Sequence, residues 1–335
     1  MKLITLEEHF LDKRISEAND AFNPPSPEQP KELQDFYKSR IRFGQALFDI
    51  KDKRLPYMDS QRITMQVLSY TSPISDKVPA HEAVKICRQA NDILAERIAE
   101  YPDRFAGFAT LPMADPKAAA DELERCVKEY HFCGTLVAGQ YQEHFYDEPQ
   151  FFPIFERAEK LDVPVSFHPA LINPRIQDFY FTSPNWGLAV AGQFASAGYG
   201  WHMDVGIHVL RMIMSGIFDK LPKLKIISGH WGELVPAFLE RLDYMFSPEI
   251  TGLKKNISEY YKKNVYVTPS GIFSSMQLEY LVKLMGADHI LYAVDFPYIQ
   301  PDNVYEFLDE SNLTREQKEL IAHGNAERIL HLGGN

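Results

Sequence analysis

Short runs of β-branched, aliphatic and aromatic residues alternate with longer stretches of helical periodicity along this chain. Such alternation is typical of βα units, whose strands form a parallel sheet. The runs are largely apolar, as expected for strands that are covered on both faces. We expect eight strands, at Leu3–Leu6, Met65–Tyr70, Phe105–Thr110, Gly134–Ala138, Pro164–Phe167, Lys225–Ser228, Val265–Thr268 and Ile290–Val294. Eight strands in successive βα units predict an α/β fold, the (β/α)8 TIM barrel.

The stretches between the strands carry apolar residues at helical spacing. Asp115 followed by Pro116 is typical of a helix start, with an N-cap and a proline in the first turn. Thr314 with Gln317 three residues later indicates a capping box before the last helix. We expect helices at His81–Tyr101, Ala118–Tyr130, Glu148–Leu161, Met203–Phe218, Ser274–Met285 and Thr314–Leu330. Because the sequence has neither an internal repeat nor an interdomain linker, we expect one domain over residues 1–335.

Two segments depart from this alternation of strands and helices, and each follows an expected strand. Residues 11–53, after the first strand, are polar and include a proline-rich turn at residues 23–27. Residues 170–202, after the fifth strand, are rich in aromatic residues and poor in periodicity. A barrel builds its active site at the carboxyl ends of its strands, so long loop insertions after strands 1 and 5 are expected to be functional. The second one is too hydrophobic for disorder, which predicts a lid or an oligomer contact.

The charge and the cysteine content of the chain exclude several classes of partner and of site. The formal net charge of −11 disfavours nucleic acid and anionic membranes, because both would be repelled. A small anionic substrate remains compatible with this charge, since a metal ion or an arginine can attract it locally. The three cysteines have no paired spacing, which argues against a disulfide framework and against a thiolate zinc site. With no signal peptide and no apolar run of about 18 residues, we expect a soluble cytoplasmic protein.

Five polar residues stand at the ends of four expected strands. Glu7 and His9 end the first strand two positions apart, so that both side chains point to the same side. His168 ends the fifth strand, His230 the sixth and Asp295 the eighth. In a barrel all these ends converge on one mouth. Imidazole and carboxylate groups bind Zn²⁺ or Mn²⁺, and a catalytic site keeps one coordination position open.

Four of these residues predict a metal site. Glu7, His9, His168 and Asp295 form a set of two imidazoles and two carboxylates that accepts either metal. Each residue alone has an ordinary alternative, since a single histidine after an apolar strand is more often a hydrogen-bonding residue. Several such residues at the same end of different strands are hard to obtain by chance. We therefore expect a site for Zn²⁺ or Mn²⁺.

The other candidates are expected around this set. Glu233, three residues after His230, suits a carboxylate that fixes the tautomer of a catalytic imidazole, or a helix N-terminal acid. Arg241 is a candidate for binding a substrate carboxylate, with a surface role as the alternative. His202, in the aromatic segment, is a candidate for substrate contact. His208 lies in an apolar helical run and is expected to be packed or to donate a hydrogen bond.

The motifs around these residues resemble those of the amidohydrolase superfamily, in its branch of metal-dependent nonoxidative decarboxylases. The opening EEHF at residues 7–10 is similar to the Glu-x-His start of hydroxybenzoate decarboxylases such as the γ-resorcylate decarboxylases. The run that ends in His168 resembles their fifth-strand motif. GHWGE at 229–233, DFP at 295–297 and GNA at 324–326 resemble their sixth-strand, eighth-strand and C-terminal signatures. The resemblance covers essentially the whole chain.

By this resemblance, Glu7, His9, His168 and Asp295 bind the metal. Many hydrolases of the superfamily begin with His-x-His and bridge two metals with a modified lysine. Here position 7 is Glu, and residues 135–139 at the end of the fourth strand contain no lysine. These departures favour one divalent metal ion, Zn²⁺ or Mn²⁺.

The resemblance further implies nonoxidative decarboxylation of a hydroxybenzoate-type aromatic carboxylic acid. The metal would hold the carboxylate and an ortho hydroxyl, Asp295 would donate the proton, and His230 and Glu233 would assist. The same residues suit a hydrolase of a lactone or related cyclic ester, in which Asp295 takes a proton from water and His230 stabilises the oxyanion. An intact ligand set argues against a non-catalytic barrel. The resemblance and the aromatic segment together favour a homodimer or a homotetramer.

Overall fold

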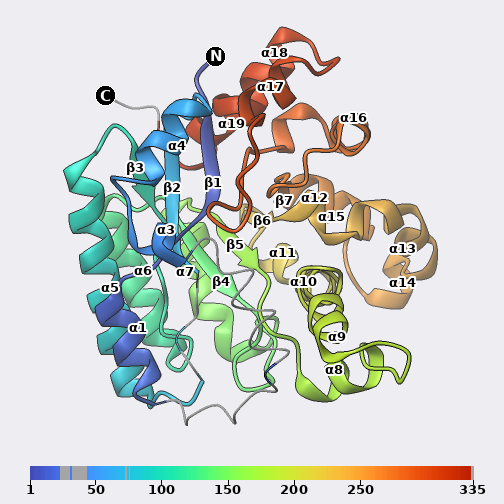
Figure 1. Ribbon diagram of the computed structural model, residues 1–335. Helices are drawn as coiled ribbons and strands as arrows, with labels where there is room; N and C mark the ends of the chain where they lie inside the picture. The colour runs from blue at the N-terminus through green and yellow to red at the C-terminus, as the bar shows by residue number, and fades with distance from the viewer. Residues whose placement is uncertain (23–30, 32–43, 72–73, 75, 333–335) are drawn as a thin grey trace.

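Parallel strands form the centre of the computed structural model, which describes residues 1–22, 31, 44–71, 74 and 76–332. The strands are β1 (Ile4–Phe10), β2 (Met65–Tyr70), β3 (Phe105–Gly107), β4 (Thr135–Ala138), β5 (Val165–His168), β6 (Ile226–Ser228) and β7 (Val265–Val267). β1, β2 and β3 pair in that order, and β4 to β7 form a second row, all in parallel. Figure 1 shows that the strands run away from the side on which both chain termini lie.

Isolated bridges join the two rows into a closed ring. Ala109, just past β3, pairs with Thr135 of β4. On the other side, residues 290–294 pair with β7 through Ile290 and with β1 through Ala293. Backbone hydrogen bonds support both contacts, since the amide of Leu291 donates to Val267 at 2.9 Å and that of Leu6 donates to Tyr292 at 2.9 Å. The (β/α)8 TIM barrel predicted from the sequence is therefore confirmed.

The eighth strand is not a regular one, so the prediction of a strand at Ile290–Val294 is wrong in this detail. The reason lies in β1, whose register with β2 shifts between Thr5 and Glu8 and whose Glu7 has a φ of 58°. At this bulge the side chain of Glu8 takes the place of a backbone acceptor for the amide of Val294. The ladder between β1 and the eighth segment is thus interrupted.

Apolar side chains fill the inside of the ring. One buried cluster draws residues from six of the strands and from the eighth segment, as the inward layers of a barrel do. The cluster includes Ile4, Leu6, Val67, Ala106, Leu136, Ala138, Ile227, Tyr266, Leu291 and Ala293. The strand residues that alternate with them, such as Leu68 and Phe105, belong to a larger cluster beneath the helices. Polar side chains at the strand ends therefore lie above a closed, packed core.

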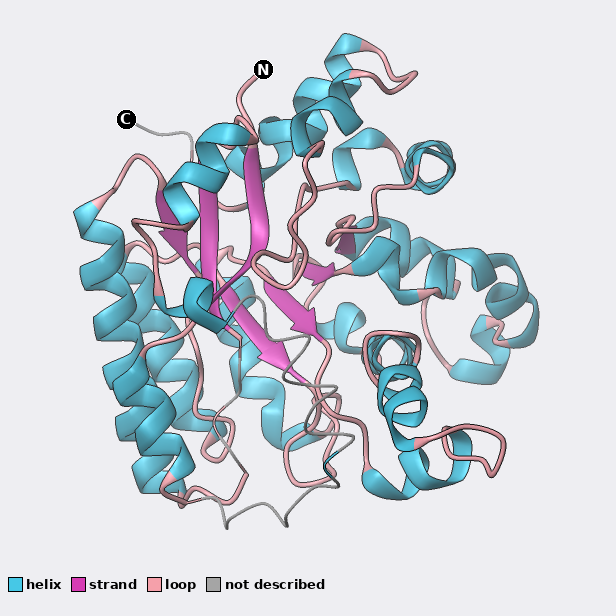
Figure 2. Ribbon diagram, viewed as in Figure 1, coloured by secondary structure: helices cyan, strands magenta, loops and turns pink. Residues whose placement is uncertain are grey.

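Helices surround the ring (Figure 2). They are α1 (Lys13–Asp20), α3 (Gly44–Phe48), α4 (Arg54–Ser60), α5 (Ala80–Glu100), α6 (Pro116–Tyr130), α7 (Phe152–Leu161), α8 (Pro174–Tyr180), α9 (Leu188–Ala195), α10 (Gly200–Met214), α11 (Ile217–Lys220), α12 (His230–Glu233), α13 (Leu239–Met245), α14 (Pro248–Thr251), α15 (Ile257–Asn264), α16 (Ser275–Met285), α17 (Val304–Asp309), α18 (Arg315–Glu319) and α19 (Asn325–Ile329). Asp115 caps α6 by accepting from the amide of Ala118 at 3.0 Å. Thr314 and Gln317 form the expected capping box of α18, and a π-helical turn at Leu320–Gly324 leads into α19.

The aromatic insertion is a pair of short helices rather than the aperiodic loop expected. Asn173 caps α8 by accepting from the amide of Arg175 at 2.9 Å, and Pro174 takes the first helical position. The segment packs on a small cluster of its own, which contains Phe181. Phe179 is 82% exposed, so part of its aromatic surface faces solvent. In the first insertion, α1 and α3 are formed, and the proline-rich turn at residues 23–27 lies outside the described residues.

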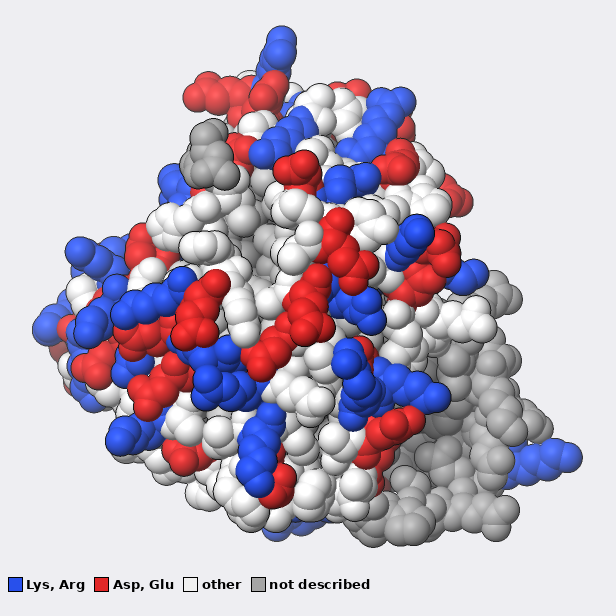
Figure 3. Space-filling view, turned by 90° about the vertical axis from the view of Figure 1, so that its left-hand side faces the viewer, with Lys and Arg blue, Asp and Glu red and all other residues white. Residues whose placement is uncertain are grey.

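Acidic and basic side chains are interspersed on the face built by the helices at the left of Figure 1 (Figure 3). Along α5, Lys85 lies 2.8 Å from Glu82 and Arg97 lies 2.9 Å from Glu100. The described part of this face thus lacks the continuous basic patch of a nucleic-acid-binding surface. Of the helices formed by the described residues, none has both the length and the apolar character needed to cross a membrane.

Candidate metal and active site

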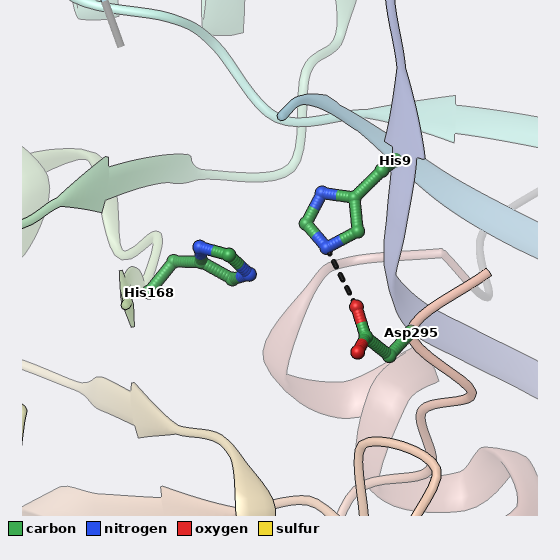
Figure 4. Close-up of side chains that lie close together, drawn as sticks. All are labelled: His9, His168 and Asp295. Carbon is green, nitrogen blue, oxygen red and sulfur yellow. Dashed lines mark hydrogen bonds and ion pairs between the residues drawn. The ribbon is translucent and has the colours of Figure 1, made fainter. Parts of the chain in front are cut away.

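Three side chains from segments far apart in the sequence point toward one another at the mouth of the barrel (Figure 4). His9 comes from β1, His168 ends β5, and Asp295 follows the eighth segment. The Nε2 atom of His9 lies 2.9 Å from Oδ1 of Asp295, and the rings of His9 and His168 are 4.7 Å apart. The ring of His9 is fully buried, and 11% of His168 and 14% of Asp295 remain exposed. Their ligand atoms lie close enough together to hold a metal ion.

Glu7 reaches the same cluster because of the bulge in β1. Its Oε1 atom lies 3.7 Å from Nε2 of His168 and 3.9 Å from Nδ1 of His230. Its Oε2 atom accepts hydrogen bonds from the hydroxyls of Thr268, at 3.3 Å, and Ser270. The two hydroxyls therefore hold one carboxylate oxygen and leave the other facing the imidazoles.

A second group of side chains adjoins the first. Glu233 accepts from Nδ1 of His230 at 2.7 Å through one oxygen and from Nδ1 of His202 at 2.7 Å through the other. The rings of His202 and His230 are 4.5 Å apart, and the carboxylate of Glu233 is fully buried. One buried carboxylate thus orients two imidazoles at the edge of the mouth.

The backbone that carries these side chains has an unusual conformation. Several site residues hold a positive φ, a region that side chains with a Cβ rarely adopt. They are Glu7 (58°), His230 (46°), Glu233 (53°), Ser270 (43°) and Asp295 (68°). Such conformations gather at functional sites, where the surrounding structure holds them in place.

The chain matches known proteins over most of its length. The amidohydrolase family model matches residues 39–332. The chain belongs to the amidohydrolase family. The γ-resorcylate decarboxylase of Rhizobium sp. is 35% identical to this amidohydrolase over 342 residues, which cover 99% of this chain and 98% of that protein. The resemblance to the decarboxylase branch, inferred above from motifs, is confirmed.

Two solved structures of decarboxylases share the fold of this amidohydrolase. The dihydroxybenzoic acid decarboxylase of Polaromonas sp., with bound manganese and the inhibitor 2-nitroresorcinol, is 33% identical with a TM-score of 0.81, over 100% of this chain and 98% of that one. The 5-carboxyvanillate decarboxylase of Novosphingobium aromaticivorans, complexed with manganese and 4-hydroxy-3-methoxy-5-nitrobenzoic acid, is 30% identical with a TM-score of 0.86, over 98% and 96%.

Burial dominates the protonation of the two carboxyl groups that face the imidazoles. It raises the pKa of Glu7 to about 7, although the charge of His230 and the hydroxyl of Ser270 oppose this rise. It likewise raises the pKa of Asp295 to about 7, again against the charge of His230. In the metal-free protein, both carboxyl groups therefore titrate near neutrality, where ordinary carboxyl groups are fully ionised.

The imidazoles divide into two kinds. Burial, aided by the positive charges of Arg54 and His230, lowers the pKa of His9 to about 3, and burial also lowers that of His168 well below its usual value. Burial opposes the protonation of His230 too, but the charges of Glu233 and Glu7 outweigh it and raise its pKa to about 10. His9 and His168 are thus neutral, as metal ligands must be, while His230 is an imidazolium.

The chemistry of the donors fits a divalent metal ion. Glu7 Oε1 is buried, and no hydrogen-bond partner for it is found among the described atoms. A buried polar atom without a partner is rare in proteins, and a cation beside it would satisfy it. Nδ1 of His168 donates a hydrogen bond to the carbonyl oxygen of Pro169 at 2.8 Å. This leaves Nε2 to face Glu7. With His9 and Asp295, this gives two neutral imidazoles and two carboxylates, a set that suits Mn²⁺ or Zn²⁺.

Of the remaining predicted residues, the structure brings some to the site and not others. His202 lies beside His230, as a substrate-contact role would require. His208 is packed in the core, as expected, and its Nε2 accepts from the amide of Tyr146 at 3.0 Å. Arg241 is exposed on α13, which Figure 1 places at the edge of the molecule, away from the strands. The structure gives no support to a contact between Arg241 and the substrate.

Three contributors to the site were missed by sequence reasoning. Thr268 and Ser270 support the carboxylate of Glu7, and their spacing of two at the end of the seventh strand was a signal of the same kind as Glu7 and His9. Gly229 was missed because its role is steric. A Cβ at this position would lie 2.9 Å from both carboxylate oxygens of Glu7. The glycine leaves the space in which that carboxylate lies.

Proposed function

We propose that this amidohydrolase is a metal-dependent nonoxidative decarboxylase of a hydroxybenzoate-type aromatic carboxylic acid. The observation that carries the proposal is the meeting of His9, His168 and Asp295 at a barrel mouth, in a chain related to γ-resorcylate decarboxylases over 99% of its length. The manganese-containing structures of two related decarboxylases hold compounds with a nitro group on the ring carbon next to a hydroxyl. A nitro group has the shape of a carboxylate, which supports a substrate with a carboxylate ortho to a hydroxyl.

Glu7, His9, His168 and Asp295 would hold one divalent ion, Mn²⁺ or Zn²⁺, and the manganese in related decarboxylases favours Mn²⁺. When bound, the ion supplies a Lewis acid that attracts and orients an anionic substrate. It also compensates charge in a chain whose net charge is −11.

Asp295 is the proposed proton donor. Its Oδ1 faces His9 and its other oxygen points away from that ring (Figure 4). Burial raises its pKa to about 7, so this carboxyl takes up a proton more readily than an exposed aspartate does. The proton that the metal displaces would return to Asp295 when the substrate binds. The proton passes to the ring carbon that bears the carboxylate, where a C–H bond forms. The bond from that carbon to the carboxylate then breaks, its electron pair restores the aromatic ring, CO₂ leaves, and Asp295 recovers a proton from water.

His230 and Glu233 would act beside Asp295. The imidazolium of His230, held at 2.7 Å by Glu233, places a fixed positive charge next to the carboxyl groups. Such a charge favours binding of the substrate anion and keeps the substrate bound until Asp295 has transferred its proton. His202, held by the same carboxylate, is proposed to contact the substrate.

The test is turnover by protein loaded with Mn²⁺. A panel of hydroxybenzoates with and without an ortho hydroxyl is followed by CO₂ release and by the ultraviolet absorbance of the ring, with a panel of lactones alongside. We expect CO₂ from the ortho-hydroxy acids only, and turnover of lactones alone would establish the hydrolase instead. Asp295→Asn should lower the rate about 100-fold or more, because Asn cannot donate the proton but tolerates a left-handed backbone. Full activity in that variant would overturn the role of Asp295.

Three expectations from the sequence stay predictions. Assembly into a homodimer or a homotetramer is supported by exposed apolar side chains of the aromatic insertion, such as Leu171 and Phe179, each 82% exposed. Light scattering of the purified chain decides this point. A single domain over residues 1–335 and a cytoplasmic location also stay predictions.

A further inference from the structure

Glu8, between Glu7 and His9 in the sequence, faces away from the site and holds the chain around Asp295. Its side chain is fully buried. The amide of Val294 donates to its Oε1 at 3.1 Å, and the amide of Phe296 donates to its Oε2 at 3.3 Å. These are the two amides on either side of Asp295. A single buried carboxyl group thus binds the backbone before and after that residue.

Two further buried side chains support Glu8 from behind. Gln66 of β2 donates to its Oε2 at 3.0 Å and accepts from Arg54 of α4 at 3.0 Å. Arg54, itself fully buried, also donates to the carbonyl oxygen of His9. Its guanidinium lies 4.6 Å from the centre of the Phe296 ring. The network therefore connects the backbone of one candidate ligand, His9, with the residue that follows another, Asp295.

The backbone pairing explains why a side chain is needed here. The amide of Leu6 bonds to Tyr292 at 2.9 Å, and the amide of His9 bonds to Phe296 at 2.6 Å. Between these two bonds the bulge in β1 removes the regular acceptors for the eighth segment, and Glu8 supplies them. Asp295, in the middle of this gap, has a φ of 68°, a conformation that a residue with a Cβ adopts only when it is held.

We propose that Glu8, supported by Gln66 and Arg54, is a positioning residue that fixes the left-handed backbone of Asp295 and thereby aims its carboxylate at His9. The proposal rests on the proposed function only for the role of Asp295. It separates the roles of the two adjacent acids of the sequence: Glu7 faces the metal site, and Glu8 holds the neighbouring eighth segment that carries Asp295. The hydrogen bonds of Glu8 go to Gln66 and to the amides of Val294 and Phe296, and not to the side chain of a candidate metal ligand.

The test is Glu8→Gln, which keeps the shape of the side chain but leaves one acceptor oxygen for two amides. The matched control is Glu122→Gln, since Glu122 is a buried glutamate of α6 that accepts hydrogen bonds from Asn91 of α5 and from Arg125. Four quantities are measured for each: the Kd of Mn²⁺ by titration calorimetry, kcat and KM of the loaded enzyme, and the urea midpoint of unfolding.

We expect Glu8→Gln to weaken Mn²⁺ binding and to lower kcat, each by about 10-fold or more, as loss of a residue behind a metal ligand does. KM should change far less than kcat. Glu122→Gln should lower the urea midpoint and leave Kd and kcat at the wild-type values. A Glu8→Gln variant that shifts the urea midpoint alone, with wild-type Kd and kcat, would reduce Glu8 to a structural residue and overturn the proposal.

Other outcomes are also decisive. If the wild type decarboxylates nothing but binds Mn²⁺, the proposed function fails while the Kd values still test Glu8. If Glu8→Gln does not fold, Gln66→Met removes the hydrogen bond behind Glu8 without changing the volume much, and the same losses are expected in smaller degree. A crystal structure of the variant gives a readout that needs neither metal nor turnover, because Asp295 should have left His9. An unmoved Asp295 contradicts the proposal.

Discussion

The Oε1 atom of Glu7 lies 3.7 Å from Nε2 of His168, although β1 and β5 stand on opposite sides of the barrel. This contact crosses the mouth and brings a free carboxylate oxygen to a neutral imidazole. A cation bound there would join the two rows of strands, which isolated bridges and the packed core beneath the mouth also connect. The packed core beneath the mouth does not depend on this cation.

Metal binding should therefore stabilise a chain that is already folded. At about 100 times its Kd, Mn²⁺ should add about 2.7 kcal/mol to the free energy of unfolding, measured by urea with and without a chelator. Glu7→Gln should lose most of this increment, whereas Glu143→Gln, a change at an exposed acid on the loop after β4, should keep it. Unfolding of the wild type on removal of metal would contradict the prediction.

Gly229→Ala should displace the carboxylate of Glu7. The added Cβ would lie 2.9 Å from both carboxylate oxygens, closer than real Cβ atoms come, so the carboxylate must move away from His168. We expect the Kd of Mn²⁺ to rise about 10-fold or more, as measured by calorimetry. Gly187→Ala is the matched control, because a Cβ there meets nothing within 4 Å. Equal Kd values for the two variants would disprove this steric account.

The affinity for metal should depend steeply on pH. Burial raises the pKa of Glu7 and of Asp295 to about 7, so below that pH the metal must displace protons from both. The affinity is therefore full above about pH 7 and falls as the pH decreases, by about 10-fold per pH unit for each displaced proton. Calorimetry in buffers of different ionisation enthalpy counts the released protons, and Glu7→Gln should release about one fewer. An affinity that does not change with pH would show that both groups are ionised before the metal binds.

Glu233→Gln should change the charge of His230. The pKa of that imidazole is raised to about 10 because the carboxylates of Glu233 and Glu7 outweigh its burial. Without the nearer carboxylate, burial should bring this pKa far down, as NMR titration of the metal-free protein would show. The rate should fall about 100-fold with it. Glu327→Gln, a carboxylate paired with His323 at 2.9 Å on the surface, should leave the rate unchanged. A His230 pKa that stays near 10 would refute the electrostatic argument.

The convergence of the site was predictable from the sequence because it depends on topology. Strand ends in a barrel meet at one mouth, so the strand ends that carry Glu7, His9, His168 and Asp295 were expected to approach one another once eight strands were recognised. The separate task of Glu8 was not predictable. Simple alternation from Ile4 and Leu6 would turn Glu8 toward the inside of the barrel. Only the bulge, which depends on the pairing of β1 with both neighbours, turns Glu7 inward instead.

The burial of charged residues far from the motifs could not be predicted from the sequence either. Arg54 lies in a polar stretch that the sequence presents as surface, yet it is fully buried beneath the site. Nothing in the local sequence distinguishes it from its exposed neighbours. The error over residues 170–202 has a local cause, since the cap and proline before α8 were present in the sequence, but the aromatic composition obscured them.

The left-handed residues of the mouth have a consequence for engineering. Each such residue costs about 1–2 kcal/mol relative to an ordinary backbone, and glycine escapes this cost. Glu7, His230, Glu233 and Asp295 all occupy this region. Glycine at these positions would therefore raise the thermal stability of the protein, but it would remove side chains that the proposed activity needs. A screen of variants for thermal stability alone would therefore select glycine at these positions, and the most stable variants would be inactive.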